Sequence, residues 1–553
     1  MSVCAGIDIG NSTTEIVLGQ HTSSGVGVLA TGRTPTRRAK GSAASLDGAV
    51  ALVQRLERQS DVRVATAVVA PLRPVETSTA SVPEATEETG RLWVAAAGVE
   101  TAGSPGFGVG RPVPLGAALS GDDPVVVVVP SGSGFAAAVA EANPLLASGR
   151  LAAVLVEDDE AVLIANRLGG GVPVVDQVAA AQILGAELVA VEVSAGSRPL
   201  RMLSDPLRLA AALRLAEAEV DDAARLVPRL LDVTNAVVAL GGRADHAAQP
   251  AAGWIGIHGS GQVPFLSGHQ LVRAGPVGRA YAYALADETP RAVDDLWTVD
   301  LADVAAAVQA RRTSTRSRPV SLGALRSDAP YVDPAPALSE RLDVPVQRAA
   351  SEAAAARIGG LSTPAAAASG VVVDLGSGTI DVVSARSPVV AAGGGELLTA
   401  SVAELAGVTG AAAEWVKRGP SHRVEAPQLL LGEDGARGFL DRPAAAETVG
   451  SLVVQGPAGL LPFSRLMAPG EWRALRLRLK VDLIGGNIAR ALRTLEESPR
   501  TVVVVGGPAG DDEVLAAVVG ALPAGTRVGR GNVAGSLGHR YAVAYGLLAL
   551  GAA

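Results

Sequence analysis

The sequence predicts an α/β protein built from two related halves, with a further α/β domain inserted into the first half. Two observations predict it: a ten-residue motif that occurs twice, and aliphatic runs such as Val125–Val129 and Val502–Val505, which are typical of buried parallel strands. The chain has 553 residues, enough for two to four domains. Its content of 48% hydrophobic and 18% charged residues is typical of a globular protein.

The repeated motif predicts a pair of β-hairpins. Its copies, Asp8–Val17 and Asp374–Val383, align without gaps, share Asp, Gly, Thr and Val, and both carry an acid at the eighth position. Each copy joins two apolar runs through a Gly/Ser/Thr turn, so each is expected to form a hairpin with a carboxylate at its tip. The copies begin 366 residues apart (374 − 8), which is too far for a solenoid and indicates two half-domains.

The segments between and after the two copies are assigned by composition. Strand-like runs between about Gly90 and Asp245 predict an inserted domain, in which the Gly/Pro-rich stretch Gly103–Gly110 is expected to be a loop. A charged, proline-containing stretch after this domain predicts a connector. The expected domains are 1–91 and 246–286 for the first half, 92–245 for the inserted domain, 287–336 for the connector or small linker domain, and 337–553 for the second half.

Both hairpin turns are suited to binding phosphate. Glycine allows backbone N–H groups to approach phosphate oxygens closely, and nearby Ser and Thr hydroxyls can donate further hydrogen bonds. Carboxylates would repel phosphate, so Asp8 and Asp374 are predicted to hold Mg²⁺ through its waters or to orient the attacking water. A third turn, Gly506-Gly507-Pro508, follows a buried strand and suits close packing of adenine or ribose. The predicted nucleotide-contacting residues are Gly10, Asn11, Ser12, Thr13, Gly376, Ser377, Gly378, Thr379, Gly506 and Gly507.

The order of the three turns resembles the phosphate-1, phosphate-2 and adenosine signature of the actin/Hsp70/hexokinase superfamily. The resemblance implies a duplicated, RNase H-like ATPase domain that binds ATP or ADP with Mg²⁺. It also implies a connecting helix before the second hairpin, and Ser351–Ala356 resembles that helix. Glu352 would then orient water or Mg²⁺ near the phosphates; the alternative is an exposed helix glutamate.

Longer stretches resemble one family within that superfamily, the large (α) subunits of diol/glycerol dehydratase reactivating factors. These stretches are Ala5–Glu15, Val156–Leu168, Pro173–Asp176, Gly529–Ser536 and Arg540–Leu547. The resemblance implies an ATP-dependent molecular chaperone that releases damaged cobalamin from an adenosylcobalamin-dependent dehydratase, with ATP hydrolysis switching dehydratase binding. It further implies a hetero-oligomer with a small (β) subunit, and a divalent metal where the inserted swivelling domain meets that subunit.

The metal ligands that the resemblance implies in the swivelling domain are, by position, Ser104, Asp158 and Asp176. Ser104 stands where the family has threonine, which keeps a hydroxyl ligand. Considered without the family, the two carboxylates are surface acids at strand ends.

Charge, hydropathy and cysteine content exclude several other classes of protein. The net charge of −8, with no basic stripe, gives no support to nucleic-acid binding, and no apolar run is long enough to cross a membrane. The N-terminus passes directly into a predicted strand, which predicts a cytoplasmic location; association with a bacterial microcompartment stays open. The single cysteine, Cys4, cannot supply a cysteine-only iron–sulfur site within one chain.

Three alternative functions remain from the sequence alone. An ammonia-lyase reactivase would share both fold and task but serve another cobalamin enzyme. A small-molecule kinase would need an acceptor pocket with an acidic base near the γ-phosphate, which the sequence does not show clearly. A filament-forming actin relative is disfavoured by the long insertion. The sequence does not specify the cobalamin enzyme, the oligomeric state or the turnover rate.

Overall fold

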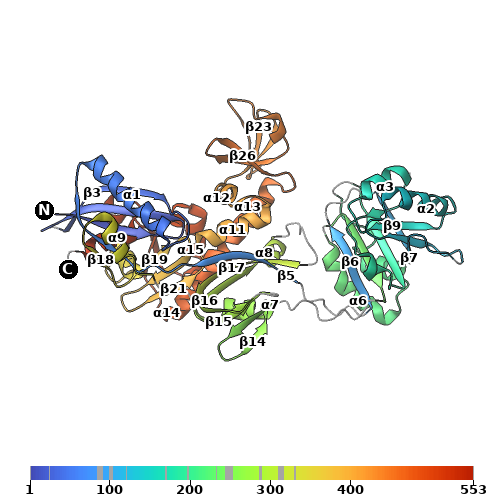
Figure 1. Ribbon diagram of the computed structural model, residues 1–553, viewed down its shortest axis with the longest axis horizontal. Coiled ribbons are helices and arrows are strands. Elements are labelled where there is room, and N and C mark those ends of the chain that lie inside the picture. Colours follow the sequence, from blue (N-terminus) through green and yellow to red (C-terminus); the bar gives the residue numbers. More distant parts are fainter. Residues whose placement is uncertain are drawn as a thin grey trace. The chain divides into compact units, whose positions relative to one another are not determined.

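Figure 1 shows the computed structural model of the chain. The structure describes residues 2–23, 25–83, 91–98, 104–119, 121–168, 171–195, 198–231, 233–242, 253–285, 289–308, 317–328 and 332–551. It divides into two compact units: the first comprises Met1–Val82, Ala252–Ala310 and Pro319–Ala553, and the second comprises Pro83–Ala251 and Arg311–Arg318. The predicted boundaries at 245 and 287 lie outside the described residues.

The first unit contains two five-stranded sheets with the same topology. Their strand orders are β3-β2-β1-β4-β18 and β21-β20-β19-β27-β28. In each sheet, three antiparallel strands are followed by two strands that run parallel to the first strand of the hairpin. This confirms the predicted duplication and both predicted hairpins. The bounds are β1 Val3–Ile9, β2 Thr13–Thr22, β3 Gly25–Pro35, β4 Val64–Val69, β18 Val346–Arg348, β19 Val371–Leu375, β20 Thr379–Val383, β21 Pro388–Ala392, β27 Thr501–Val505 and β28 Arg527–Arg530.

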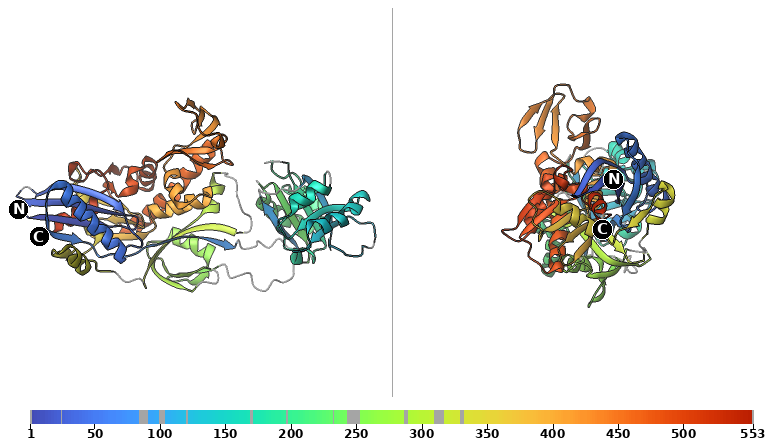
Figure 2. Two further views of the ribbon diagram at one scale, coloured as in Figure 1. Left: turned by 45° about the horizontal axis from the view of Figure 1, so that its top comes forward. Right: turned by 90° about the vertical axis from the view of Figure 1, so that its left-hand side faces the viewer.

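Helices α10 (Glu352–Leu361) and α16 (Ala542–Leu550) join the two halves. Helix α10 packs on the second sheet, α16 packs on the first, and the two helices contact each other. Glycine makes this contact possible, because a Cβ on Gly546 would lie 1.9 Å from the carbonyl oxygen of Ala355. Since α16 also packs against β1, the two ends of the chain lie close together (Figure 2).

A six-stranded sheet, β14-β13-β15-β16-β17-β5, includes the described strands of residues 287–336, the segment predicted to be a connector or small linker domain. The segment predicted to be a connector supplies two long strands and a helix, and its Trp297 is fully buried. Its charges do not mark a linker, because Asp295 is buried and forms a 2.7 Å ion pair with Arg490. The elements of this layer are β5 Glu76–Pro83, β13 Trp254–Ile257, β14 Gly261–Pro264, α7 Phe265–Ala274, β15 Ala280–Ala284, β16 Arg291–Asp300, α8 Leu301–Ala307 and β17 Ser317–Arg326.

A small five-stranded sheet, β24-β23-β22-β25-β26, is inserted between two helices of the second half, α12 and α13. Its strands are β22 His422–Ala426, β23 Leu429–Gly432, β24 Arg437–Phe439, β25 Leu452–Gly456 and β26 Gly459–Ser464. A π-helical turn, Val481–Gly485, joins α13 to α14. The remaining helices of the first unit are α1 Ala43–Ser60, α9 Ala335–Leu342, α11 Gly395–Ala406, α12 Gly410–Val416, α13 Pro469–Lys480, α14 Gly486–Leu495 and α15 Asp512–Ala521.

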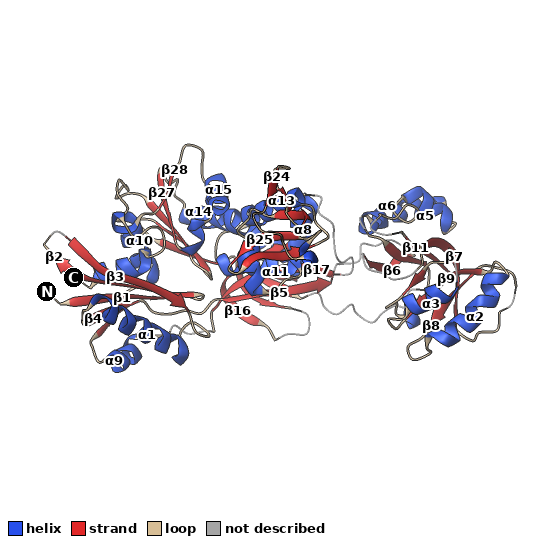
Figure 3. Ribbon diagram, turned by 90° about the horizontal axis from the view of Figure 1, so that it is seen from above, coloured by secondary structure: helices blue, strands red, loops and turns tan. Residues whose placement is uncertain are grey.

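The second unit contains one seven-stranded sheet, β10-β9-β8-β7-β11-β12-β6, with its helices on the sheet faces (Figure 3). The stretch predicted to be a loop forms, from Gly106 onward, the central strand of this sheet; Gly103 lies outside the described residues. A Cβ on Gly108 would lie 1.9 Å from the carbonyl oxygen of Ala152, so the glycines there allow close approach of two backbones. The glycines therefore reflect packing and not a turn.

The bounds in the second unit are β6 Leu92–Gly98, β7 Gly106–Pro114, β8 Val125–Val129, α2 Phe135–Ala147, β9 Leu151–Val156, α3 Ala161–Leu168, β10 Val174–Val175, α4 Ala180–Ile183, β11 Leu188–Val193, α5 Pro206–Ala212, α6 Val220–Leu226 and β12 Asn235–Leu240. None of the described helices in either unit is long and apolar enough to cross a bilayer.

Candidate functional site

A cavity of about 1,700 Å³ in the first unit brings the three predicted turns together. Both hairpin turns and the turn after β27 line it, as does the start of α10. The predicted site residues found in its wall are Asp8, Gly10, Asn11, Ser12, Thr13, Glu352, Asp374, Gly376, Ser377, Gly378, Thr379, Gly506 and Gly507. Residues that the sequence places up to about 500 positions apart (507 − 8 = 499) are therefore neighbours in one site.

The two hairpin turns have the same backbone geometry. The N–H of Gly10 donates a 2.9 Å hydrogen bond to the carbonyl oxygen of Thr13, and the N–H of Gly376 donates one of the same length to that of Thr379. A Cβ at either glycine would lie 2.8–3.0 Å from that oxygen, which is why both copies have glycine at this point. The duplication thus extends from the strand order to individual turn hydrogen bonds.

The turns also touch each other across the cavity. The backbone N–H of Ser12 donates a 3.1 Å hydrogen bond to Oγ of Ser377. A Cβ on Gly378 would lie 2.6 Å from the side-chain nitrogen of Asn11, which itself donates to the carbonyl oxygen of Val75 at 3.2 Å. Backbone N–H groups and hydroxyls from both halves therefore meet in one small region, the arrangement that suits an anion with many oxygens.

The strand register places the acids of each motif in pairs. Asp8 is opposite Glu15 in one hairpin, and Asp374 is opposite Asp381 in the other. Residues directly opposite in an antiparallel pair have side chains on the same face, and all four acids line the cavity. The matching acid at position eight of the motif is thus the partner of the acid at position one.

Crowding of these carboxyl groups raises their pKa values. Loss of water contact, followed by the charges of Glu352 and Glu15, raises the pKa of Asp8 well above its ordinary value. Burial, followed by the charge of Asp381, does the same for the pKa of Asp374. Burial raises the pKa values of Glu15 and Asp381 to about 7. A site with this much negative charge favours a bound cation.

Lys40, which the sequence analysis missed, supplies an ammonium group to this cluster. Its side chain is 8% exposed, and its Nζ lies 2.8 Å from Oε2 of Glu352. Burial lowers the pKa of Lys40, but the opposing effect of Glu352, Asp8 and Asp381 is larger, so its pKa stays above the ordinary value. The predicted helix is confirmed, with Ser351 as its N-cap, and Glu352 is paired to a lysine and is not simply exposed to solvent.

The third turn is built against the second hairpin. Gly506 has a φ of 90°, and a Cβ there would lie 2.3 Å from the carbonyl oxygen of Leu375 and 2.5 Å from Oδ1 of Asp374. Only glycine fits such a position. Beside it, a Cβ on Gly507 would lie 3.0 Å from Nη1 of Arg540, and that arginine lies 3.7 Å from Glu15.

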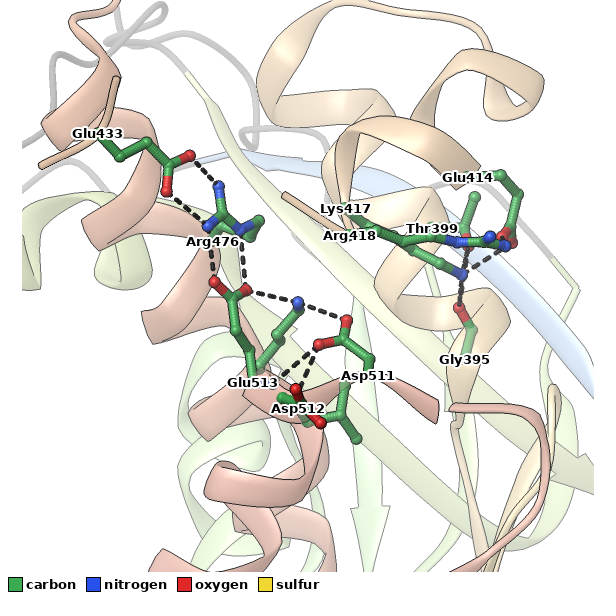
Figure 4. A network of polar contacts seen from close by, with 12 residues as sticks. Gly395, Thr399, Glu414, Lys417, Arg418, Glu433, Arg476, Asp511, Asp512 and Glu513 are labelled. Atoms are coloured by element: carbon green, nitrogen blue, oxygen red, sulfur yellow. Dashed lines mark hydrogen bonds and ion pairs between the residues drawn. The ribbon is translucent and has the colours of Figure 1, made fainter. Parts of the chain in front are cut away.

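Helices α11 and α12 form a further wall that the sequence analysis also missed (Figure 4). Nζ of Lys417 donates to the carbonyl oxygen of Gly395 at 3.2 Å, to Oγ1 of Thr399 at 2.7 Å and to Oε1 of Glu414 at 2.8 Å. All three N–H groups of this ammonium are used, so it holds the two helices together. Arg418, whose side chain is 52% exposed, lines the cavity next to it.

A compositional signal points to Lys40 and Lys417. The chain has 47 lysine and arginine residues, of which only Lys40, Lys417 and Lys480 are lysine. The first two line the cavity and the third lies behind it, with side-chain exposures of 8%, 13% and 0%. Arginine and lysine are not interchangeable at enclosed sites, so the rare lysines of an arginine-rich chain mark positions where a compact ammonium is needed.

Comparisons with known proteins match the two parts of the chain to two parts of one family. Residues 292–551 match the family model of the diol dehydratase reactivase ATPase-like domain. Residues 96–243 match that of the DD-reactivating factor swiveling domain. Both models describe domains of diol dehydratase reactivases, so the two matched parts of the chain resemble the two domains of that family.

Relatives and solved structures of this family match along the whole chain. The chain is 28% identical over 606 aligned residues to the diol dehydratase-reactivating factor large subunit of Klebsiella michiganensis, covering 99% of this chain and 98% of the relative. The propanediol dehydratase-reactivating factor large subunit of Salmonella typhimurium matches with the same identity and coverage. A glycerol dehydratase reactivase structure covers 100% of both chains at a TM-score of 0.66, with 24% identity. The nucleotide-free form of diol dehydratase-reactivating factor gives 0.65 over 99% of both chains, also at 24%.

The part of the chain that matches the swivelling domain carries the three residues predicted to bind a second metal. Asp158 and Asp176 follow the carboxyl ends of the adjacent parallel strands β9 and β10, and Ser104 lies two residues before β7. The hydroxyl of Ser131 (2.6 Å) and the N–H of Gly132 (2.8 Å) donate to Asp158 and lower its pKa. Burial, followed by the charge of Asp159, raises the pKa of Asp176.

No three His, Cys, Asp or Glu residues are grouped as a complete metal site in the described ranges of either unit. A metal bound by Ser104, Asp158 and Asp176 would therefore need further ligands from elsewhere. The role of these three residues stays a prediction.

Proposed function

We propose that this protein is the ATP-hydrolysing large subunit of a reactivase, a molecular chaperone that releases damaged cobalamin from an adenosylcobalamin-dependent diol or glycerol dehydratase. One observation carries the ATP-dependent part of the proposal: two hairpins of identical topology bring Asp8 and Asp374 to one cavity, with their glycine turns in contact. The dehydratase as client follows from the full-length match to large subunits of dehydratase-reactivating factors.

The nucleotide is assigned to the cavity by the chemistry of its walls. The turns at Gly10–Thr13 and Gly376–Thr379, whose shape is fixed by their internal hydrogen bonds, would place their hydroxyls and remaining polar backbone groups beside the phosphates, and the turn at Gly506–Gly507 would accommodate the adenosine end. Lys40 adds a positive charge on the phosphate side, next to Glu352. The wall formed by Glu414, Lys417 and Arg418 lies on the side of α11 and α12.

The residues present also fit Mg²⁺. The site is rich in carboxylate oxygens, the ligands that Mg²⁺ prefers, and Oδ1 of Asp381 is buried with no hydrogen-bond partner in the described part of the chain. Mg²⁺ usually keeps several waters and shares its ligands with phosphate, so a few carboxylates suffice. Asp8 and Asp374 are the residues that would hold it, and its contribution is to neutralise charge on the transferring phosphoryl group.

The chain's own part in hydrolysis is to position groups and to stabilise charge. Glu352, held by its hydrogen bond from Lys40, would orient the attacking water. Because the γ-phosphate would be held by hydrogen bonds from both halves, its loss would release contacts between them. Such a change of state is sufficient to switch dehydratase binding without a high turnover rate.

The partners follow from the same assignment. A large subunit implies a small (β) subunit and a hetero-oligomer, and Ser104, Asp158 and Asp176 of the swivelling domain would share a divalent metal with it. Partly buried carboxylates at strand ends and a hydroxyl are oxygen ligands of the kind that Mg²⁺ and Ca²⁺ accept.

A rescue assay tests the proposed function. A cobalamin-dependent diol or glycerol dehydratase is inactivated with glycerol, then mixed with this protein, its small subunit, Mg²⁺, ATP and fresh adenosylcobalamin. Recovery of dehydratase activity should require ATP and disappear with Asp374→Ala, while Asp441→Asn, which changes an exposed carboxylate of the small sheet, should leave it intact. ATP hydrolysis without recovery of any diol or glycerol dehydratase would reject the client and favour another cobalamin enzyme or a kinase.

A further inference from the structure

Five charged side chains form a continuous series of ion pairs at the cavity wall: Glu433, Glu513 and Asp511 line the cavity, and Arg476 and Lys480 connect them (Figure 4 labels all but Lys480). Arg476 bridges Glu433 at 2.6 Å and Glu513 at 2.7 Å, and Lys480 bridges Glu513 at 2.7 Å and Asp511 at 2.6 Å. The side chains of Arg476 and Lys480 have no exposed area. Two cations of α13 therefore join an acid of the small sheet to two acids at the start of α15.

At one end of this series of ion pairs, Asp511 holds the turn assigned to adenosine. Asp511 directly follows the 3₁₀ turn Gly507–Gly510 and is the N-cap of α15, accepting the N–H of Glu513 at 2.9 Å with Oδ1. Its other oxygen, Oδ2, accepts from Lys480. Both oxygens of this carboxylate are thus fixed, and Lys480 sets where the turn ends.

At the other end, Glu433 and Arg476 hold the segment that leads into the small sheet. Glu433 lies in the turn between β23 and β24, and its Oε1 accepts both the N–H and the hydroxyl of Ser421 at 2.7 Å. The guanidinium of Arg476 lies directly beneath Gly419, where φ is 54° and a Cβ would lie 2.5 Å away. The segment that leads into the sheet is therefore placed by the same arginine that contacts Glu513.

The outer strands of the small sheet, β23 and β24, are partly or fully exposed to solvent. Strand β24 is exposed along its length, Phe439 is 83% exposed, and the side chains of β23 are all partly exposed. Phe463 contacts Trp472 of α13, with ring centroids 5.4 Å apart, and so adds an apolar contact near the base of the sheet. The position of the sheet thus depends strongly on the contacts at its base.

We propose that Arg476 and Lys480 are positioning residues that couple the adenosine turn to the small sheet, so that nucleotide binding at Gly506–Gly510 changes the mobility of residues 420–468. Buried ion pairs add little net stability compared with apolar packing, so stability alone does not account for this series of ion pairs. They do fix geometry, because each guanidinium or ammonium fits its carboxylates in one arrangement. The inference rests on the proposed nucleotide site.

Hydrogen–deuterium exchange of the full-length protein, with and without ADP and Mg²⁺, tests the coupling. We expect ADP to slow exchange in residues 420–468 of the native protein by about fivefold or more. Glu433→Gln removes the charge that ties the sheet to Arg476, and Arg476→Lys keeps the charge but loses the fork that spans both glutamates. Both variants should still bind ADP in calorimetry and lose the response of residues 420–468.

A matched control is Arg437→Gln, which breaks the 2.7 Å ion pair with Glu425 on an exposed part of the same sheet and should leave the response unchanged. A full response in Glu433→Gln or Arg476→Lys would overturn the proposal, as would ADP binding by the native protein without any response in residues 420–468. If the native protein does not bind ADP at all, the proposed function fails and the inference fails with it. Two variants are used so that misfolding of one does not prevent the test.

Discussion

Replacing Asp381 with asparagine is expected to stabilise the protein increasingly as the pH rises, when nucleotide and Mg²⁺ are absent. Asp381 is 5% exposed, faces Asp374 across the hairpin, and has an oxygen, Oδ1, with no hydrogen-bond partner in the described ranges. Burial, followed by the charge of Glu352, raises its pKa from 3.8 to about 7. An isosteric amide removes the ionisation and keeps the shape of the side chain.

The magnitude follows from the two pKa values. The folded protein binds this proton more tightly than the unfolded chain, so the contribution of Asp381 to stability is fully present below pH 3.8 and is lost as the pH rises to about 7. The loss is about 1.4 kcal/mol per pH unit, or about 4 kcal/mol in total from (7 − 3.8) × 1.36. Asparagine does not titrate, so any effect of its own contacts changes the free energy of unfolding by the same amount at every pH.

Urea unfolding between pH 5 and pH 9, in the presence of a chelator, measures the difference. Four of the five tryptophans, Trp254, Trp297, Trp415 and Trp472, belong to the first unit, so fluorescence reports mainly on the unit that contains the site. The stability advantage of Asp381→Asn should grow between pH 5 and pH 7 and become constant above about pH 7. An advantage that is independent of pH, or that grows toward acid pH, would refute the reasoning.

Two further predictions concern other parts of the first unit. Lys40→Arg keeps the charge but should lower kcat/KM for ATP hydrolysis by ten- to a hundredfold, about 1.4–2.8 kcal/mol. The reason is that a planar guanidinium does not fit the enclosed space of the Lys40 ammonium, whose side chain is 8% exposed and lies 2.8 Å from Glu352. Hydrolysis at the native rate would show that the ammonium has no special role. Gly546→Ala should destabilise the protein by about 1–3 kcal/mol in thermal unfolding, because its Cβ would lie 1.9 Å from a backbone oxygen. Gly520→Ala, in α15 with nothing within 4 Å, is the matched control and should be neutral or slightly stabilising; equal effects of the two alanines would contradict the close contact between α10 and α16.

The parts of the site that could be predicted from the sequence are those that depend only on residues close together in the sequence. A glycine-containing turn between two apolar strands favours a β-hairpin, so Asp8–Thr13 and Asp374–Thr379 could be assigned from ten residues each. Pairing of Asp8 with Glu15 follows from the same hairpin register. Nothing in either segment needed information from the rest of the chain.

The parts that were missed depend on contacts between distant segments. Gly106 and Gly108 look like loop residues, yet they are strand residues because another backbone passes within van der Waals contact of them. Asp295 looks like part of a charged linker, yet it is buried because Arg490, 195 positions away, neutralises it. Lys40 and Glu352 are 312 positions apart, and neither has a local pattern that predicts the ion pair.

The two halves have the same topology but different charge at the third strand, and this difference indicates where a cation is needed. In the first sheet Glu15 lies opposite Arg33 and 3.7 Å from Arg540, so two guanidinium groups oppose its charge. In the second sheet the residue opposite Asp381 is Val390, and no arginine takes the place of Arg33. Glu15 and Asp381 occupy matching positions, but the positive charges near them differ, so we expect the two carboxylates to have different roles. On the side of Asp374 and Asp381 the opposing cation is Lys40, which also faces Asp8 and Glu352, so the negative charge there is less fully opposed. The Mg²⁺ that the proposed function requires is therefore expected nearer the second hairpin than the first.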